Sequence, residues 1–190
     1  YYVGECWRNL YLDQGPVTDF ALKTPGLIYN GEAQLPEAVV KSPLGRELDS
    51  STYTVTASTG RKNVGKYSVK VKMKDDSGFT GEKTLYFSIN PKGATIKTPS
   101  ALTKGFTAKW SKQSAKMATS RITGYQIRYS LNSSMSGAKT KTIKGYSKTS
   151  KKVTKLKAKK KYYIQVRTYK VVGGKTYYSN WSAKKSVKTK

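Results

Sequence analysis

Residues 124–129 read Gly124-Tyr125-Gln126-Ile127-Arg128-Tyr129, and this stretch decides the fold class of the chain. Large apolar or aromatic side chains alternate with polar ones, as they do on an extended strand whose successive residues point to opposite faces. One face must then be covered by a second layer while the other meets water. The stretch therefore predicts one strand of an antiparallel β-sandwich.

The same alternation recurs along the chain, while helical periodicity is almost absent. Short polar runs rich in glycine, asparagine, serine and proline separate the alternating stretches, as turns separate strands. Gly173-Gly174 predicts a hairpin turn, and the small polar residues 112–121 predict a long loop. The alternating runs, which we expect to be strands, are 53–57, 67–74, 85–89, 106–110 and 162–167.

A length of 190 residues suits two small sandwiches in tandem. Asn90-Pro91-Lys92-Gly93 marks a boundary, because proline lacks a ladder donor and glycine frees the backbone. We expect a first domain over 17–93 and a second over 94–190. Residues 1–16 have no assigned role and are expected to be the tail of a preceding module or a strand added to the first sandwich.

The balance of charged residues changes at the same boundary, near residue 93. All ten acidic residues lie between Glu5 and Glu82, and the first 93 residues hold twelve of the 37 lysines and arginines. The other 25 lie in residues 94–190, which contain no aspartate or glutamate. This half has no carboxylate side chains for an acid–base pair or for a Ca²⁺ or Mg²⁺ site.

Residue types also argue against catalysis in the whole chain. Histidine is absent and Cys6 is the only cysteine, so no intrachain disulfide, cysteine metal cluster or Ser-His pair can form. In the first half, Asp75-Asp76 could ligate Ca²⁺ or be a solvated turn, and we prefer the turn. A glycosidase-like pair would need the fold to bring Glu37, Glu47 and Asp49 into one cleft. We expect no enzyme, no cofactor and no bound metal.

Four features of residues 94–190 follow one another in a familiar order. Trp110 ends one alternating run, residues 124–129 form the next, Leu156 precedes Tyr162 by six residues, and Ser179-Asn180-Trp181-Ser182 comes before Val187. In these features the second half resembles a fibronectin type III domain. The resemblance implies a core tryptophan and a tyrosine corner, in which a tyrosine hydroxyl bonds back to the chain before its strand. No Arg-Gly-Asp occurs, so integrin adhesion does not carry over.

Residues Tyr178-Ser179-Asn180-Trp181-Ser182 are also similar to the Trp-Ser-x-Trp-Ser box of cytokine receptors. The similarity implies stacking of an arginine on the aromatic faces, with Arg167 or Arg128 in that part. The paired cysteines of those receptors are missing here. We interpret the motif as a structural ladder.

A second spaced pattern runs through the first domain: Tyr29-Asn30-Gly31, Pro36, Leu48, Tyr53-Thr54-Val55, Asn63-Val64-Gly65, Phe79-Thr80-Gly81 and Phe87-Ser88-Ile89-Asn90-Pro91. With it, residues 26–91 resemble the bacterial immunoglobulin-like repeats of surface proteins from Gram-positive anaerobes. The combined resemblance implies two tandem antiparallel β-sandwiches, immunoglobulin-like and then fibronectin type III-like. It also implies a secreted or surface-attached setting, with other domains of the same parent protein as neighbours. No apolar run reaches the length of a membrane span, so we expect no membrane insertion.

The lysines of the second half suggest a function. A set of exposed cations can bind a polyanion by displacing its counterions, or can be a solvated coat that protects a sheet edge. We favour binding, because a domain that needed only solubility could mix both signs of charge. An anionic cell-wall polymer or host glycan is the expected partner, and sequence-specific nucleic acid is not, since no helix-turn-helix or zinc pattern occurs. The expected contributors are Lys151, Lys152, Lys157, Lys159, Lys160 and Lys161.

Two tyrosines offer an alternative. Tyr163 and Tyr169 are predicted on the outer face of one strand, where rings could stack on sugars of a neutral glycan or pair across strands. We prefer the pairing. Two functional alternatives therefore stay open: carbohydrate-binding accessory modules of a secreted hydrolase whose catalytic domain lies elsewhere, and an inert stalk.

Overall fold

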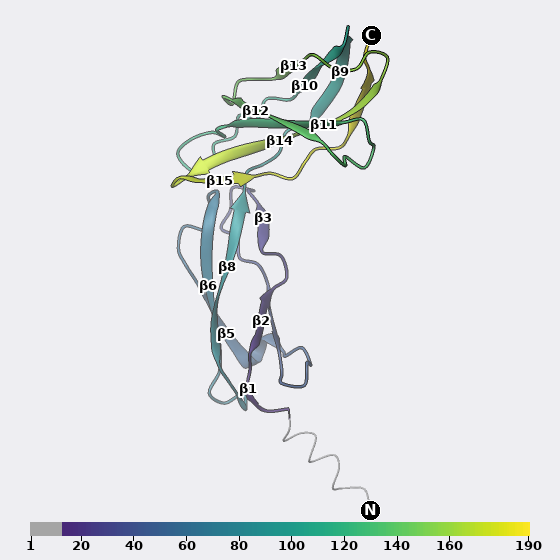
Figure 1. Ribbon diagram of the computed structural model, residues 1–190. Coiled ribbons are helices and arrows are strands. Elements are labelled where there is room, and N and C mark those ends of the chain that lie inside the picture. The colour runs from purple at the N-terminus through teal and green to yellow at the C-terminus, as the bar shows by residue number, and fades with distance from the viewer. Residues whose placement is uncertain (1–12) are drawn as a thin grey trace, which may run out of the picture. The chain divides into compact units, whose positions relative to one another are not determined.

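The computed structural model describes residues 13–190 (Figure 1). The predictions for Glu5, Cys6 and most of the N-terminal segment lie outside these residues. The described chain consists of β-strands, turns and one short 3₁₀ helix, so the predicted all-β fold of tandem sandwiches is confirmed. It divides into two compact units, residues 13–27 with 32–89 and residues 28–31 with 90–190. Between residues 13 and 190, no helix has the length and apolar character needed to cross a membrane.

Strands β1 to β8 and the 3₁₀ helix build the first sandwich. A two-stranded sheet pairs β2 with β4, and a four-stranded sheet has the order β3-β8-β6-β5. β1 pairs with β7 in parallel, so Gly15 and Pro16 add a short ladder to this sandwich. The elements are β1 (Gly15–Pro16), β2 (Asp19–Leu22), β3 (Gly26–Ile28), β4 (Ala38–Lys41), η1 (Ser50–Thr52), β5 (Tyr53–Ala57), β6 (Gly65–Met73), β7 (Phe79–Thr80) and β8 (Glu82–Asn90).

The core of the first sandwich follows the alternation in its long strands. Val69 and Val71 on β6 are fully buried, and Phe87 on β8 packs against the half-buried Tyr67. β5 differs, because it is the edge of its sheet: Tyr53 is buried there, whereas Val55 is exposed. For β5, alternation alone therefore predicted more buried side chains than the strand has.

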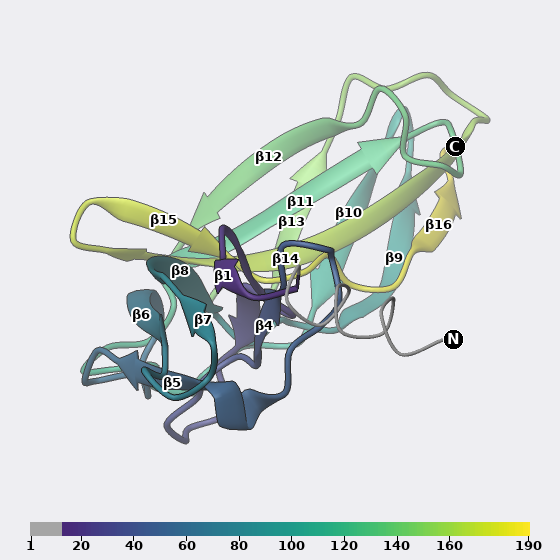
Figure 2. The same cartoon turned by 90° about the horizontal axis from the view of Figure 1, so that it is seen from below.

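Strands β9 to β16 build the second sandwich (Figures 1 and 2). One sheet has the order β13-β10-β9, and the other has the order β12-β11-β14-β15 with β16 also paired to β14. The strands are β9 (Ile96–Leu102), β10 (Gly105–Trp110), β11 (Gly124–Ser130), β12 (Lys139–Lys144), β13 (Ser150–Val153), β14 (Lys161–Val172), β15 (Lys175–Tyr178) and β16 (Lys185–Lys188).

Aromatic side chains from both sheets fill the second core. Trp110 on β10 is 1% exposed, its ring centroid lies 5.3 Å from that of Tyr125 on β11, and its indole Nε1 donates to the Lys148 carbonyl at 2.9 Å. Phe106 lies 5.6 Å from Tyr129 and 6.1 Å from Tyr162 between ring centroids. Such tilted and edge-on pairs contribute beyond the area they bury.

A tyrosine hydroxyl fixes the entry into β14. The backbone N–H of Lys157 donates to the Tyr162 hydroxyl at 3.2 Å, which is the bond that a tyrosine corner requires. At the other end of β14, Gly173 and Gly174 have φ of 54° and 75°. Two successive left-handed residues are what a two-residue hairpin turn needs, and β15 follows directly.

Between β15 and β16 the chain leaves regular strand geometry but remains bonded to β14. The Ser179 hydroxyl accepts from the Thr168 N–H at 3.0 Å, and the Ser182 hydroxyl accepts from the Val166 N–H at 3.1 Å. Serine side chains thus satisfy donors of β14 where no strand covers them. Residues 179–184 form no strand; this serine-bonded segment joins β15 to β16, and both strands pair with β14.

The long loop between β10 and β11 is tied down by a buried lysine. Lys170 on β14 is 2% exposed, and its ammonium donates to the Ser120 carbonyl, the Ser120 hydroxyl and the Arg121 carbonyl at 2.8–2.9 Å. Burial lowers the pKa of Lys170. Three acceptors match the three donors of an ammonium group, so this charge is buried without unsatisfied protons.

Candidate functional site

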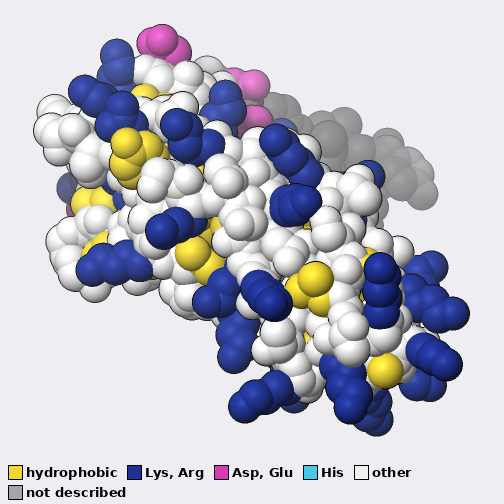
Figure 3. Space-filling model, turned by 90° about the horizontal axis from the view of Figure 1, so that it is seen from above, with side chains coloured by type: hydrophobic (Ala, Val, Ile, Leu, Met, Phe, Trp, Pro, Cys, Tyr) yellow, Lys and Arg dark blue, Asp and Glu magenta, His cyan; other side chains and the backbone are white. Residues whose placement is uncertain are grey.

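Cations of the second sandwich have no carboxylate partners within it. The side-chain ion pairs found between residues 13 and 190 all join residues of the first half, for example Lys23 with Glu37 at 3.0 Å. On the face that Figure 3 shows, Lys and Arg side chains are many and Asp and Glu side chains are few. The positive charge of residues 94–190 is therefore left for solvent ions or a ligand to neutralise.

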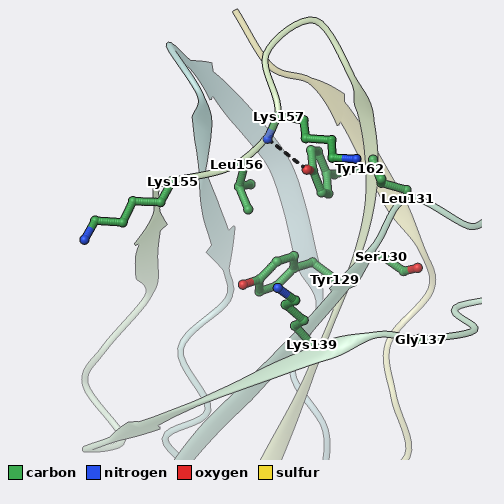
Figure 4. Close-up of a pocket in the computed structure, with 9 residues that line it drawn as sticks. All are labelled: Tyr129, Ser130, Leu131, Gly137, Lys139, Lys155, Leu156, Lys157 and Tyr162. Atoms are coloured by element: carbon green, nitrogen blue, oxygen red, sulfur yellow. Dashed lines mark hydrogen bonds between the residues drawn. The ribbon is translucent and has the colours of Figure 1, made fainter.

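Several of these lysines gather around a groove where the two sheets of the second sandwich part. β12 is the last strand of one sheet and β13 the last strand of the other. A cavity of about 470 Å³ lies between them, and an adjoining one of about 330 Å³ continues toward the turn before β14 (Figure 4). We call the two together the lysine groove; its charged residues are Lys139, Lys141, Lys151, Lys152, Lys155 and Lys157.

Strand register explains why lysines reach this groove. Lys139 and Lys141 on β12 stand opposite Tyr129 and Ile127 on β11, whose side chains are in the core. Directly opposed residues share a face of the sheet, so both lysines are on the inner side of β12. They reach water only because β12 is an edge that no strand of the facing sheet covers.

Lys151 is placed in the same way from the other sheet. It stands opposite Ala108 on β10, which is fully buried. Lys151 is therefore also on an inner face, and cations from both sheets meet in one opening. Lys155 lines both cavities and has φ of 60°, a conformation that glycine or asparagine adopts at lower cost.

Tyr129, Leu156 and Tyr162 line the deeper wall of the groove. Tyr129 is only 5% exposed, and its hydroxyl forms no hydrogen bond with residues 13–190. In Figure 4 this hydroxyl points away from Tyr162, toward the side on which Lys155 lies. Burial, with a smaller effect of Tyr162, raises the pKa of Tyr129. The groove thus combines flexible ammonium groups with one fixed, neutral hydroxyl donor.

A separate aromatic ladder covers the outer face of β14. The Arg167 guanidinium lies between two rings, 3.8 Å from the Tyr178 centroid and 4.3 Å from the Trp181 centroid. Arg128 lies 4.5 Å from the same Trp181 ring. Gln126 accepts from two nitrogens of Arg167, as Gln165 does from Arg128, at 2.7–3.0 Å. With neutral acceptors in place of carboxylates, the ladder holds two positive charges in fixed positions.

These features agree with a comparison of the chain with protein-family models. The model for the fibronectin type III domain matches residues 90–185, which is about half of the chain. The chain belongs to the fibronectin type III family. Trp110 in the core, the bond from Lys157 to Tyr162 and the ladder at Trp181 are the features of the second unit that fit it.

Solved structures similar to this chain include the FN1-FN3 domains of chicken CNTN1, with 17% identity, a TM-score of 0.40, and coverage of 92% of this chain and 67% of that one. Another is a beta-1,2-glucanase from Parabacteroides distasonis, with 16% identity and a TM-score of 0.40. That match covers 65% of this chain and 17% of the glucanase. No curated protein matches the chain.

The six lysines predicted to bind a polyanion lie in two places in the fibronectin type III domain. Lys151, Lys152 and Lys157 line the lysine groove, whereas Lys159, Lys160 and Lys161 lie beyond it, at the turn and the start of β14. Lys139 and Lys141 were not among the predicted lysines, because they are far in sequence from residues 151–161. The one sequence feature that points to them is their alternation with threonine ahead of Ile143, which puts them on the same face of the strand as Ile143.

Of the two tyrosines named as an alternative for stacking on sugars, Tyr169 is covered by its neighbours. Its side chain is 8% exposed, its ring centroid lies 6.3 Å from that of Tyr178, and one of its ring carbons lies 2.9 Å from where a Cβ at Gly124 would stand. Outer-face neighbours cover the ring, so it is not available to a sugar. Tyr163 is half-buried, and the Lys161 ammonium lies 5.4 Å from the centroid of its ring.

Carboxylates of the first unit have structural contacts. Glu37 pairs with Lys23, and Asp49 accepts from the Ser51 N–H at the start of η1. Together with Glu47 they raise the pKa of Tyr53, after the larger effect of burial. Asp75 approaches Lys72 at 3.9 Å in a turn. No group of three acidic, cysteine or histidine residues within 13–190 is arranged to hold a metal ion.

Proposed function

We propose that the chain is a non-catalytic extracellular module of a larger bacterial protein. Its fibronectin type III domain binds an anionic cell-wall or host glycopolymer, and the first sandwich is a spacer of immunoglobulin-like type. The single observation that carries the proposal is the gathering of lysines from two sheets around one groove in a half-chain without acidic residues.

Electrostatics favour this function over a solvated coat. Like charges held together destabilise the folded domain, and mixing in acids would relieve the repulsion. A polyanion relieves it instead, and gains affinity from released counterions. The groove offers no carboxylate to act as a general acid or base, so binding is the chemistry that its residues support.

The test is binding of the whole chain to teichoic acid, heparin and an uncharged glycan over a series of salt concentrations. We expect binding to one of the polyanions near 0.15 M salt, a steep loss above it, and no binding of the uncharged glycan. Substitution of the six lysines Lys151, Lys152, Lys157, Lys159, Lys160 and Lys161 by glutamine should weaken binding. If no polyanion binds at physiological salt, the lysines are a coat and the chain is an inert spacer.

A further inference from the structure

The lysine groove has an arrangement that edge protection does not require. One inward-pointing lysine on an edge strand is enough to discourage pairing with another sheet. Here Lys139 and Lys141 from β12 and Lys151 from β13 point into one opening, with Lys155 at its side. Four ammonium groups without a carboxylate in their half of the chain repel one another across this space.

Tyr129 supplies an independent observation. Its ring is almost completely buried, and its hydroxyl has no hydrogen-bond partner among residues 13–190. No fully buried side-chain oxygen of these residues lacks a partner, so the Tyr129 hydroxyl is open to the groove, where it can donate to a ligand. An anion oxygen in the groove would accept from this hydroxyl while the lysines neutralise its charge.

The cations of the groove are all lysines. All three arginines of the fibronectin type III domain stack on rings elsewhere: Arg121 on Tyr146, Arg128 on Trp181, and Arg167 on Trp181 and Tyr178. Arginine binds carboxylates and phosphates through a rigid fork, whereas lysine is a point charge that binds an anionic oxygen from any direction. A groove walled by lysine alone therefore suits a flexible polymer whose anionic groups arrive in varied orientations.

Width favours a slender polymer. Packed sheets lie about 10 Å apart, and lysine side chains enter the opening from both of them. A chain of phosphodiesters joined by short polyol spacers fits such a space better than a row of sulfated sugar rings. We therefore propose that the lysine groove binds a linear phosphodiester polymer, with Lys139, Lys141, Lys151 and Lys155 around the phosphates and the Tyr129 hydroxyl donating to one of them. This assignment rests on the proposed function and adds its site and ligand class.

The experiment compares two variants of the whole chain that lose the same charge. The groove variant carries glutamine at Lys139, Lys141, Lys151 and Lys155. The control variant carries glutamine at Lys97, Lys109, Lys175 and Lys185, which are exposed on β9, β10, β15 and β16. Affinity for poly(glycerol phosphate) is measured from about 0.05 to 0.3 M salt, within the range in which counterion release dominates.

We expect the groove variant to bind about tenfold or more weakly at 0.15 M salt, with a salt slope shallower by about three, and the control variant to stay within about twofold of the original chain. Tyr129→Phe should lower the affinity about threefold or more without changing that slope, since it removes a neutral donor. Equal losses of affinity in the groove variant and the control variant would overturn the assignment of the groove as the binding site, but would leave the proposed binding of polyanions intact. Absence of binding by the unaltered chain would instead overturn the proposed function.

Parallel measurements with heparin and polyglutamate test the class of ligand. We expect weaker binding of both, with little difference between the groove and control variants. Groove-dependent binding of heparin or polyglutamate as tight as that of poly(glycerol phosphate) would overturn the phosphodiester assignment. Circular dichroism of each variant verifies that its sandwiches remain folded.

Discussion

The Arg167 guanidinium carbon lies 4.3 Å from the centroid of the Trp181 ring. Because Trp181 comes from the serine-bonded segment between β15 and β16, this contact joins an irregular part of the chain to the middle of β14. Arg128 shares the same ring, so one indole holds two guanidinium groups in register.

Trp181→Ala should lower the free energy of unfolding by about 2 kcal/mol, since two cation–π contacts and the area beneath the indole are lost together. Trp181→Phe, which keeps a smaller ring, should lower it by about half as much. Urea denaturation followed by circular dichroism measures both. A change below about 0.5 kcal/mol in the alanine variant would show that the ladder contributes no stability.

Tyr162→Phe removes the hydroxyl that accepts from the Lys157 N–H and leaves the ring in the core. We expect a loss of about 1 kcal/mol, the usual net value of one such bond. Tyr163→Phe is the matched control on the neighbouring, half-buried residue, and should change stability by less than about 0.5 kcal/mol. Equal effects of the two substitutions would contradict the role given to the corner.

Lys170→Met should release the loop between β10 and β11. Three hydrogen bonds from a charged donor to Ser120 and Arg121 are lost, although the Ser120 carbonyl still accepts from the Met117 N–H, so we expect a loss of about 1–3 kcal/mol. Trypsin should then cut faster at Lys112, Lys116 and Arg121 within this loop. Lys175→Met, at an exposed position on β15, is the control. Unchanged cleavage and stability would show that the loop holds its place without Lys170.

Tyr129→Phe should change how stability depends on alkaline pH. Burial, and to a lesser extent Tyr162, raises the pKa of Tyr129 above 10.0. The unfolded chain therefore loses this proton first, so the contribution of Tyr129 is complete below about pH 10 and is lost as pH rises through its pKa in the folded protein.

The phenylalanine variant lacks that loss. Its free energy of unfolding relative to the original chain should accordingly increase between about pH 9 and 11, a difference in which the charges common to both proteins cancel. Urea denaturation at several pH values gives the two curves. Parallel curves would mean that the Tyr129 hydroxyl titrates alike in the folded and unfolded states.

The local sequence was enough to predict the class of fold and several of its strands and turns. Alternation around Ile127 and around Val69 predicted strands, because the two-residue period of a strand is a property of the backbone itself. Gly173-Gly174 predicted its hairpin for the same local reason. The spacing of Leu156 and Tyr162 indicated the corner, whose bond joins residues only five positions apart.

What covers a face was decided by tertiary structure. Alternation placed Tyr169 on the outer face of β14, but not beneath Tyr178 and over Gly124, which are neighbours only after β11, β14 and β15 have paired. Lys139 and Lys151 meet at one groove because each sheet ends on a different strand, and nothing in either local sequence specifies that meeting. The sequence alone determined the strands and the charge; long-range pairing decided which cations face one another, because contacts between distant residues depend on the order of strands in the sheets.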